Sequence, residues 1–149
     1  MQRIHGTCVL LSGLGVLLRG PSGSGKSDLA LRLIDGGARL VADDQVELDR
    51  DGQELRARAP RPLAGLIEVR GVGLMPMDAA EDAPVGLVVD LLPAAGEAER
   101  LPEVETAELL GVAVRRLALH PFHASAAAKL RLAAAAQAAG CLRPVPDRT

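Results

Sequence analysis

The sequence has almost no aromatic residues: it contains one phenylalanine, no tryptophan and no tyrosine in 149 residues. The core must therefore be aliphatic, and the hydrophobic fraction of 48% is ample for a globular core. Aromatic rings on which proteins stack the bases of single-stranded nucleic acids are missing. Because the net charge is −2 and no basic run is present, we expect no nucleic-acid partner.

Cysteines and long apolar runs are also scarce. Cys8 and Cys141 stand far apart, without C-x-x-C spacing or a histidine cluster, so we expect reduced, buried thiols. No apolar run is long enough to span a membrane, and residues 1–5 lack the regions of a signal peptide. We therefore expect a cytoplasmic protein with no membrane partner, formed by one domain over residues 1–149.

The most informative stretch present is a phosphate loop. Residues 20–27, GPSGSGKS, match G-x-x-x-x-G-K-[ST] at every fixed position. The apolar run at 15–18 is typical of a buried strand, and residues 28–35 are typical of a helix. Glycines let backbone N–H groups face phosphate oxygens, and the start of the helix adds free donors and a positive dipole end.

This motif predicts binding of ATP or a similar polyphosphate. Lys26 can reach the β- and γ-phosphates, and the Ser27 hydroxyl can bind Mg²⁺. Since aromatic residues are almost absent, we expect the adenine to lie on aliphatic or backbone surface. The residues predicted to bind the phosphates are Gly20, Ser22, Gly23, Ser24, Gly25, Lys26 and Ser27.

The rest of the chain mixes strand and helix patterns. The expected elements are a hairpin over 6–19 turning at Ser12-Gly13, a strand over 39–48 interrupted at two aspartates, a return strand at 54–58, an extended segment at 66–74, a strand at 86–92, a short helix at 105–110, a strand at 112–119 and an Ala-rich helix at 125–139. This order predicts an α/β fold in which a P-loop-containing mixed sheet is flanked by helices, not a regular doubly wound sheet.

Phosphoryl transfer also needs a carboxylate for the metal and an acceptor for the proton of the attacking hydroxyl. Two apolar runs end in aspartate, at Asp43-Asp44 and at Asp90. At the carboxyl end of a strand, Asp43 and Asp44 can turn toward the phosphate loop, whereas Asp90 is followed by Leu91 and is expected within a strand. We therefore favour Asp43 and Asp44 over Asp90, with a solvated turn as the alternative.

The sequence resembles the C-terminal catalytic domain of the HPr kinase/phosphorylase family. The matching segments are 4–6 (IHG), 20–28, 39–44 (RLVADD) and 67–73 (IEVRGVG), the last resembling the signature E-[IV]-R-G-x-G. Residues 105–112 also resemble a family stretch, so the similarity covers most of 4–119. The resemblance implies a fold like that of HPr kinases and PEP carboxykinases, in a short form expected to lack the family's N-terminal domain.

The resemblance also implies an activity and a partner. The γ-phosphate of ATP, with Mg²⁺, would pass to a serine of a small HPr-type phosphocarrier protein. In the reverse step, inorganic phosphate would attack the phosphoserine and release pyrophosphate. Asp43 would be the general base toward serine and the general acid in reverse, while His5 would lie near Asp43 and orient it. The family further implies a homo-oligomer, expected to be a hexamer.

Further roles follow from the same resemblance. Glu68 and Arg70 would complete the polar cluster, and Arg70 would stabilise the charge of the transferred phosphoryl group. Asp44 would help to position the metal or water, although the residues do not decide which of Asp43 and Asp44 is the base. Arg100 is the positional match to a family arginine in a loop over the substrates.

Some observations point elsewhere. Residues 120–125 (HPFHAS) replace an Arg- and Gly-rich segment of the family. Without the resemblance, His5 would be an ordinary surface or capping residue, and Glu68 and Arg70 a solvated pair on a strand face. Two other functions remain open: a small-molecule P-loop kinase in which Asp43 activates a metabolite hydroxyl, and a non-catalytic nucleotide sensor.

Overall fold

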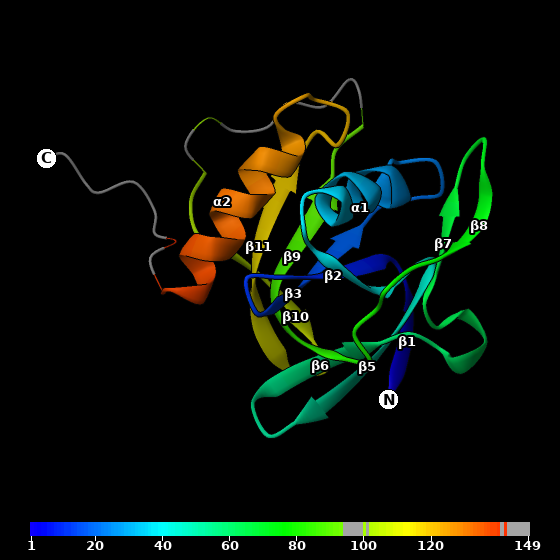
Figure 1. Cartoon of the computed structure of the whole chain (residues 1–149). Coiled ribbons are helices and arrows are strands. Elements are labelled where there is room, and N and C mark those ends of the chain that lie inside the picture. Colours follow the sequence, from blue (N-terminus) through cyan, green and yellow to red (C-terminus); the bar gives the residue numbers. More distant parts are fainter. Residues whose placement is uncertain (94–99, 101, 141, 143–149) are drawn as a thin grey trace, which may run out of the picture.

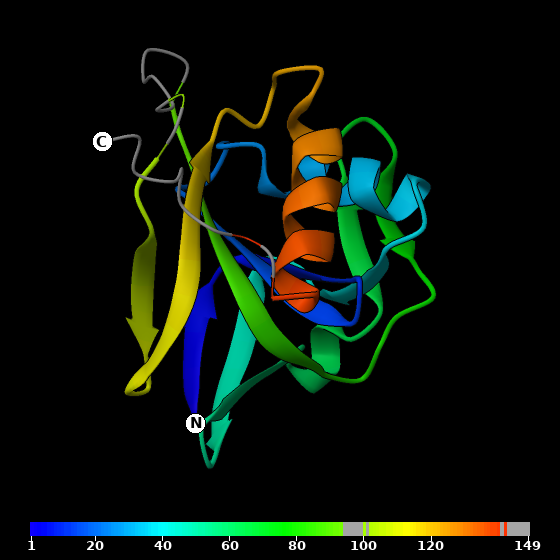
Figure 2. The same cartoon turned by 90° about the vertical axis from the view of Figure 1, so that its left-hand side faces the viewer.

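The computed structural model describes residues 1–93, 100, 102–140 and 142 (Figure 1). A curved mixed sheet forms the body of the molecule, and both α-helices of the described chain cover one of its faces (Figures 1 and 2). The elements are β1 (Gln2–His5), β2 (Thr7–Leu11), β3 (Leu14–Arg19), α1 (Lys26–Asp35), β4 (Arg39–Ala42), β5 (Gln45–Asp51), β6 (Glu54–Arg58), a 3-10 turn (Arg61–Leu63), β7 (Leu66–Val69), β8 (Gly73–Pro76), β9 (Ala83–Leu91), β10 (Glu105–Leu109), β11 (Val112–Leu119) and α2 (Ala126–Ala138).

The strand order of the nine-stranded sheet is β1-β5-β6-β9-β3-β2-β4, and the β10–β11 hairpin joins it along β9. Strand β3, which leads into the phosphate loop, lies parallel to β9 and antiparallel to β2. Strand β9 changes partners along its length: its first residues pair with β6 and its last with β11. The phosphate loop therefore starts from a central strand that is paired on both edges.

Side chains alternate along β3 and β9 and so divide the core into two parts. Val16 and Leu18 of β3 are buried on the face that carries the helices, while Leu17 is buried on the other face. On that other face, Leu17 packs with side chains of β4, β5, β6 and β11 because the sheet curves over itself. Burial of each such side chain stabilises the fold by about 1.5–3 kcal/mol, so β3 is anchored on both faces.

Most expected elements are present, but the helix expected over 105–110 is wrong. Residues Glu105–Leu109 form strand β10, antiparallel to β11. Leu110 and Gly111, with φ of 50° and 77°, make the two-residue turn that joins the strands, a geometry that matches the twist of a hairpin. A helix of this length is marginal in water, whereas pairing with β11 satisfies the backbone groups of the segment.

The segment expected to be extended over 66–74 is extended only in part: a turn at 70–72 divides it into β7 and β8, which pair as a hairpin. This hairpin is a separate two-stranded sheet, and β7 packs beside α1 (Figure 1). Gly71, with φ of 84°, lies in its turn. The hairpin carries Glu68 and Arg70 to the same end of the molecule as the phosphate loop.

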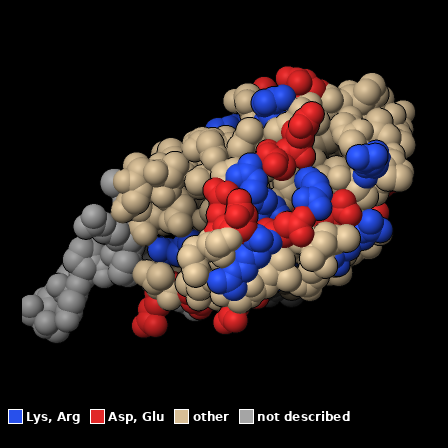
Figure 3. Space-filling model, turned by 90° about the horizontal axis from the view of Figure 1, so that it is seen from below, with Lys and Arg blue, Asp and Glu red and all other residues tan. Residues whose placement is uncertain are grey.

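Charged residues are mixed on the face formed around β5 and β6 (Figure 3). Several arginines there contact carboxylates, as in the pairs Arg58–Asp49 and Arg56–Asp82, with N–O distances of 2.5 and 2.7 Å. The positive charges on this face are therefore largely paired. In the part of the chain that the structure describes, no helix is long and apolar enough to cross a membrane.

Candidate active site

The phosphate loop is folded around the side chain of Lys26. Residues 20–25 connect β3 to α1, and Gly23 and Gly25 have positive φ angles of 81° and 98° that favour glycine. The Lys26 ammonium donates hydrogen bonds to the carbonyl oxygens of Gly20 (2.6 Å) and Pro21 (2.9 Å). Burial lowers the pKa of Lys26, while the charges of Asp43 and Asp44 oppose that shift. The lysine thus holds the loop in shape from within.

Asp43 follows β4 directly and is buried where three other elements meet. Its Oδ1 accepts hydrogen bonds from the hydroxyls of Thr7 (3.0 Å) and Ser27 (2.7 Å), and its Oδ2 accepts one from the backbone N–H of Glu68 (3.0 Å). The residues Thr7 and Asp43 are 0% and 5% exposed. A buried carboxylate needs such partners, and they set its orientation beside the first turn of α1.

Asp44 turns the chain from β4 into β5. It has a φ of 68°, in the left-handed region that aspartate tolerates, and its carbonyl accepts a hydrogen bond from the N–H of Gly6. The side chain extends toward solvent, with Oδ1 3.5 Å from Nδ1 of His5. The resemblance implied that His5 lies near Asp43. The structure places both residues in one pocket, but the contact of His5 is with Asp44.

These side chains line a pocket of about 330 Å³ next to the phosphate loop. Most of the predicted site residues are brought together here: His5, Ser22, Gly23, Gly25, Lys26, Ser27, Asp43, Asp44, Glu68 and Arg70. Gly20 and Ser24 do not line the pocket and instead accept hydrogen bonds from Lys26. Arg100 is exposed and does not line it, and its neighbours 94–99 and 101 lie outside the described residues.

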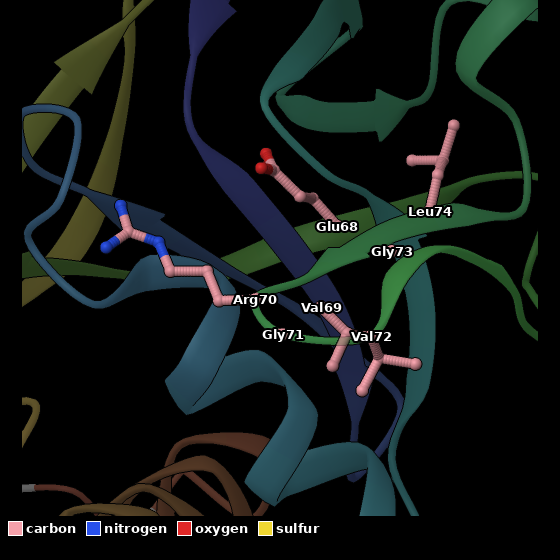
Figure 4. Close-up of a pocket in the computed structure, with 7 residues that line it drawn as sticks. All are labelled: Glu68, Val69, Arg70, Gly71, Val72, Gly73 and Leu74. Atoms are coloured by element: carbon pink, nitrogen blue, oxygen red, sulfur yellow. The ribbon is translucent and has the colours of Figure 1, made fainter.

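Glu68 and Arg70 extend from one side of the β7–β8 hairpin, whereas Val72 and Leu74 point elsewhere (Figure 4). The hairpin residues 68–74 also line a shallow hollow of about 540 Å³ that adjoins the pocket. An Nη of Arg70 lies 3.9 Å from the position a Cβ would take on Gly23. The Arg70 guanidinium therefore lies near Gly23 of the phosphate loop, and Glu68 contacts Asp43 through its backbone N–H.

Sequence reasoning missed two side chains of this pocket that bear on its chemistry. Thr7 follows the matched segment at 4–6, so that match could have drawn attention to it. Phe122 is about a hundred residues from the phosphate loop in sequence and carried no local motif, yet it lines the pocket. The adenine was expected to lie on aliphatic or backbone surface, and the pocket offers one aromatic side chain beside such surface.

Asp90 lies within β9, as expected, and outside the pocket. It accepts two hydrogen bonds from Arg19 (2.8 and 3.0 Å) and one from Arg116 (2.5 Å). Burial raises the pKa of Asp90, but the hydrogen bonds from Arg19 and Arg116 outweigh it and hold the pKa below its usual value. Asp90 therefore links β9 to two neighbouring strands, β3 and β11, through ion pairs with Arg19 and Arg116.

Of the two cysteines expected to be reduced and buried, Cys8 is within the described residues. Cys8 is fully buried, as expected, and burial raises its pKa to about 12, so the thiol is inert. Cys141 lies outside the described residues.

The oxygen atoms near the phosphate loop fit a magnesium ion. The Ser27 hydroxyl and the Asp44 carboxylate line the same pocket. Hard oxygen donors suit Mg²⁺, which typically takes one or two protein carboxylates together with phosphates and water. No group of three or more His, Cys, Asp or Glu residues in the described ranges could hold a metal by itself. The donor set therefore suits Mg²⁺ bound together with a phosphate.

Known proteins resemble this chain both in sequence and in structure. It is 39% identical over 127 residues to an HPr kinase/phosphorylase of Bordetella pertussis, covering 78% of this chain and 41% of that protein. It is 51% identical over 74 residues to the enzyme of that name from Clostridium beijerinckii, covering 49% of this chain and 24% of the relative. These matches span less than half the length of the relatives.

A solved structure shares the fold. The HPr(Ser) kinase/phosphatase structure from Coxiella burnetii matches with a TM-score of 0.78 and 26% identity, over 89% of this chain and 87% of that chain. The predicted mixed α/β P-loop fold is thereby confirmed. The family model described as the HPr serine kinase C-terminal domain matches residues 1–138. Since that match covers most of the sequence, the chain belongs to the HPr serine kinase C-terminal domain family.

Proposed function

We propose that residues 1–149 act as one kinase domain that uses ATP to phosphorylate a serine of a small HPr-type phosphocarrier protein. The observation that carries this proposal is the position of Asp43, a buried carboxylate hydrogen-bonded to Ser27 of the phosphate loop and to the backbone of Glu68 in the family signature. A carboxylate beside the phosphate loop can accept a proton from a hydroxyl that attacks the γ-phosphate. The description of the family model, HPr serine kinase C-terminal domain, and the name of the HPr(Ser) kinase/phosphatase structure support a serine hydroxyl as the acceptor.

In the forward reaction, the serine oxygen attacks the γ-phosphorus as the bond to the β,γ-bridging oxygen breaks. Asp43 accepts the serine proton, and ADP leaves. Lys26 and Arg70 stabilise the charge on the phosphoryl oxygens, since both face the phosphate-loop end of the pocket. In the reverse reaction, inorganic phosphate attacks the phosphoserine, Asp43 returns the proton to the serine oxygen, and pyrophosphate is released.

The remaining predicted residues take supporting roles in this proposal. Ser27 and Asp44 would hold Mg²⁺, which supplies charge neutralisation for the phosphates. His5 would orient the Asp44 carboxylate that it contacts, and thereby the acidic turn that contains Asp43. Glu68 positions Asp43 through its backbone, and Arg100 would approach the substrates from its loop. A homo-oligomer, with a hexamer as the expected form, belongs to the same proposal, and light scattering tests it.

The test is phosphorylation of a purified HPr-type carrier with ATP and Mg²⁺, read as phosphoserine by mass spectrometry. Wild type should form phosphoserine, and Asp43→Asn should be slower by about 10²- to 10⁴-fold, the usual contribution of a general base. ATP affinity should be nearly unchanged in this variant. Asp51→Asn, at the exposed end of β5, is the matched control and should behave as wild type.

Two results would contradict the proposal in different ways. If wild type binds ATP but forms no phosphoserine, the chain is a metabolite kinase or a nucleotide sensor. A metabolite kinase would then show ATP turnover stimulated by a small hydroxyl compound. If Asp43→Asn phosphorylates the carrier at the wild-type rate, Asp43 is not the base and the catalytic assignment fails. Pyrophosphate release from phosphoserine carrier and inorganic phosphate tests the reverse reaction separately.

A further inference from the structure

The single phenylalanine of the sequence lies at the proposed nucleotide site. Phe122 is in the connection between β11 and α2, and it lines the pocket that contains Lys26 and Asp43. The residue is 65% exposed, whereas the core of the chain is built from aliphatic residues. The position of the ring is therefore not explained by burial in the core.

The ring packs against the phosphate loop itself. A Cβ on Gly25 would lie 2.8 Å from Cζ of Phe122 and 3.2 Å from Cβ of Pro121, so only a glycine backbone allows this approach. Gly25 is the last residue before α1, next to Lys26 and Ser27. The aromatic surface is thus held at the point where the phosphate loop becomes a helix.

The backbone on both sides of Phe122 is held by Arg32 of α1. The Arg32 guanidinium donates hydrogen bonds to the carbonyl oxygen of Pro121 and, at 3.4 Å, to that of His123. Its Nε also donates to Asp28 at 3.1 Å, which orients the guanidinium along the helix. A ring presented by a braced loop needs little ordering when a ligand binds, which favours affinity.

The pocket has both charged and apolar side chains in its lining. Arg70 lies near Gly23, whereas Leu31 of α1, Val69 of β7 and Phe122 supply the apolar part of the lining. A ligand whose phosphates lie on Lys26 and Arg70 carries its base beyond the phosphates. Because a nucleobase is flat and binds well to an aromatic face, Phe122 is the surface in this pocket suited to it.

We propose that the base of the bound nucleoside triphosphate stacks on Phe122, which makes this residue a determinant of nucleotide affinity. The inference rests on the proposed function only in assuming that the phosphate loop binds a nucleoside triphosphate. Stacking on a protein ring gives about a 5- to 100-fold gain in affinity, by the usual cost of removing such a ring. A ligand that has phosphates but no base should gain nothing from Phe122.

The experiment compares binding of ATP and of inorganic tripolyphosphate, both with Mg²⁺, by calorimetry. Phe122→Ala should weaken ATP binding by about 5- to 100-fold and leave tripolyphosphate binding unchanged. Phe122→Leu keeps an apolar group against Gly25 but has no flat face, so it should also lose affinity for ATP. Leu132→Ala removes another exposed apolar side chain, on α2, and is the control expected to match wild type.

Phe122→Trp gives a direct spectroscopic readout because the chain has no tryptophan. It should retain ATP affinity, and its fluorescence should respond to ATP but not to tripolyphosphate. The inference is overturned if Phe122→Leu binds ATP as wild type does, or if Phe122→Ala weakens both ligands equally, because the ring would then only support the loop.

The result also separates this inference from the proposed function. If wild type binds ATP and the Phe122 variants bind it with the same affinity, the stacking inference is overturned and the proposed kinase function is unaffected. Selective loss of ATP affinity, without phosphorylation of any carrier by wild type, supports the stacking and overturns the kinase. Wild type that binds neither ligand overturns both.

Discussion

The Ser27 hydroxyl donates a 2.7 Å hydrogen bond to Oδ1 of Asp43. This bond joins the first turn of α1 to the residue that follows β4. The phosphate-binding element and the proposed base are therefore already in contact before any substrate binds. Asp43 has two further donors, Thr7 and the backbone of Glu68. Its position is therefore determined by several elements, and each can be tested separately.

Thr7→Val should reduce catalysis while preserving nucleotide binding. Valine has nearly the shape of threonine but cannot donate to Asp43, so the carboxylate loses one of its anchors. We expect kcat for carrier phosphorylation to fall by about 10- to 100-fold, with the KM for ATP unchanged, because small displacements of a catalytic group are costly. Loss of the buried hydrogen bond should also lower the free energy of unfolding by about 1 kcal/mol.

Thr7→Ser is the variant that distinguishes positioning from packing. Serine retains the hydroxyl but lacks the methyl group, so it should keep most of the activity while losing some stability. Equal loss of kcat in Thr7→Val and Thr7→Ser would show that the methyl packing matters and the hydroxyl does not. Urea unfolding and steady-state kinetics on the same samples measure both effects.

Lys26→Met should abolish tight binding of ATP. The ammonium group bonds loop carbonyls and is the cation nearest to where the phosphates would lie, so its loss removes charge-assisted hydrogen bonds. We expect the Kd for ATP to rise by about 10- to 100-fold in calorimetry. The only other lysine of the sequence, Lys129, is exposed on α2, and Lys129→Met is the matched control. Equal affinities of the two variants would contradict the assignment of the phosphate loop.

Asp90→Asn should destabilise the protein at neutral pH by an amount that shrinks in acid. The carboxylate neutralises Arg19 and Arg116 in the partly buried part of the sheet, and its removal should cost about 1–3 kcal/mol of unfolding free energy. Since the pKa of Asp90 is lower in the folded than in the unfolded chain, this stabilisation is present above the ordinary carboxyl pKa of about 4. It is lost as the pH falls through the lower, folded-state value.

Urea unfolding of wild type and Asp90→Asn at pH 7, 5 and 3 would measure this dependence. The control is Asp82→Asn, because Asp82 also pairs with an arginine but at the surface, where such a pair contributes about 0.2–1 kcal/mol. A difference between wild type and Asp90→Asn that stays constant down to pH 3 would show that the charge of Asp90 is not what stabilises the sheet.

Ser12→Asn should stabilise the β2–β3 hairpin. Ser12 and Gly13 form its two-residue turn with φ of 54° and 78°, and Ser12 is exposed. Asparagine adopts positive φ more readily than serine, and Asn-Gly is the preferred pair in such turns. We expect a gain of about 0.5–1 kcal/mol and a rise in Tm of about 1–4 °C in a thermal melt. Gly13→Ala should have the opposite effect, and a lower Tm for Ser12→Asn would contradict this description of the turn.

Local features were predictable from the sequence because a few neighbouring residues encode them. The phosphate loop, the strand before it, the helix after it and the turn at Ser12-Gly13 all depend on glycine positions and apolar spacing within short windows. The segment at 105–110 was predicted wrongly because its local pattern suited a short helix. It forms strand β10 because it pairs with β11, and a local pattern does not encode that partner.

The arrangement of side chains in the site was decided by the tertiary structure. From the sequence, Asp43 and Asp44 were equivalent neighbours, and the fold buries Asp43 against Thr7 and Ser27 while Asp44 turns outward to His5. Phe122 joined the pocket because the order of strands brings the connection after β11 beside Gly25. Local patterns determine which elements form, whereas strand order and register determine which side chains meet. Those pairings depend on contacts between residues that lie far apart in the chain.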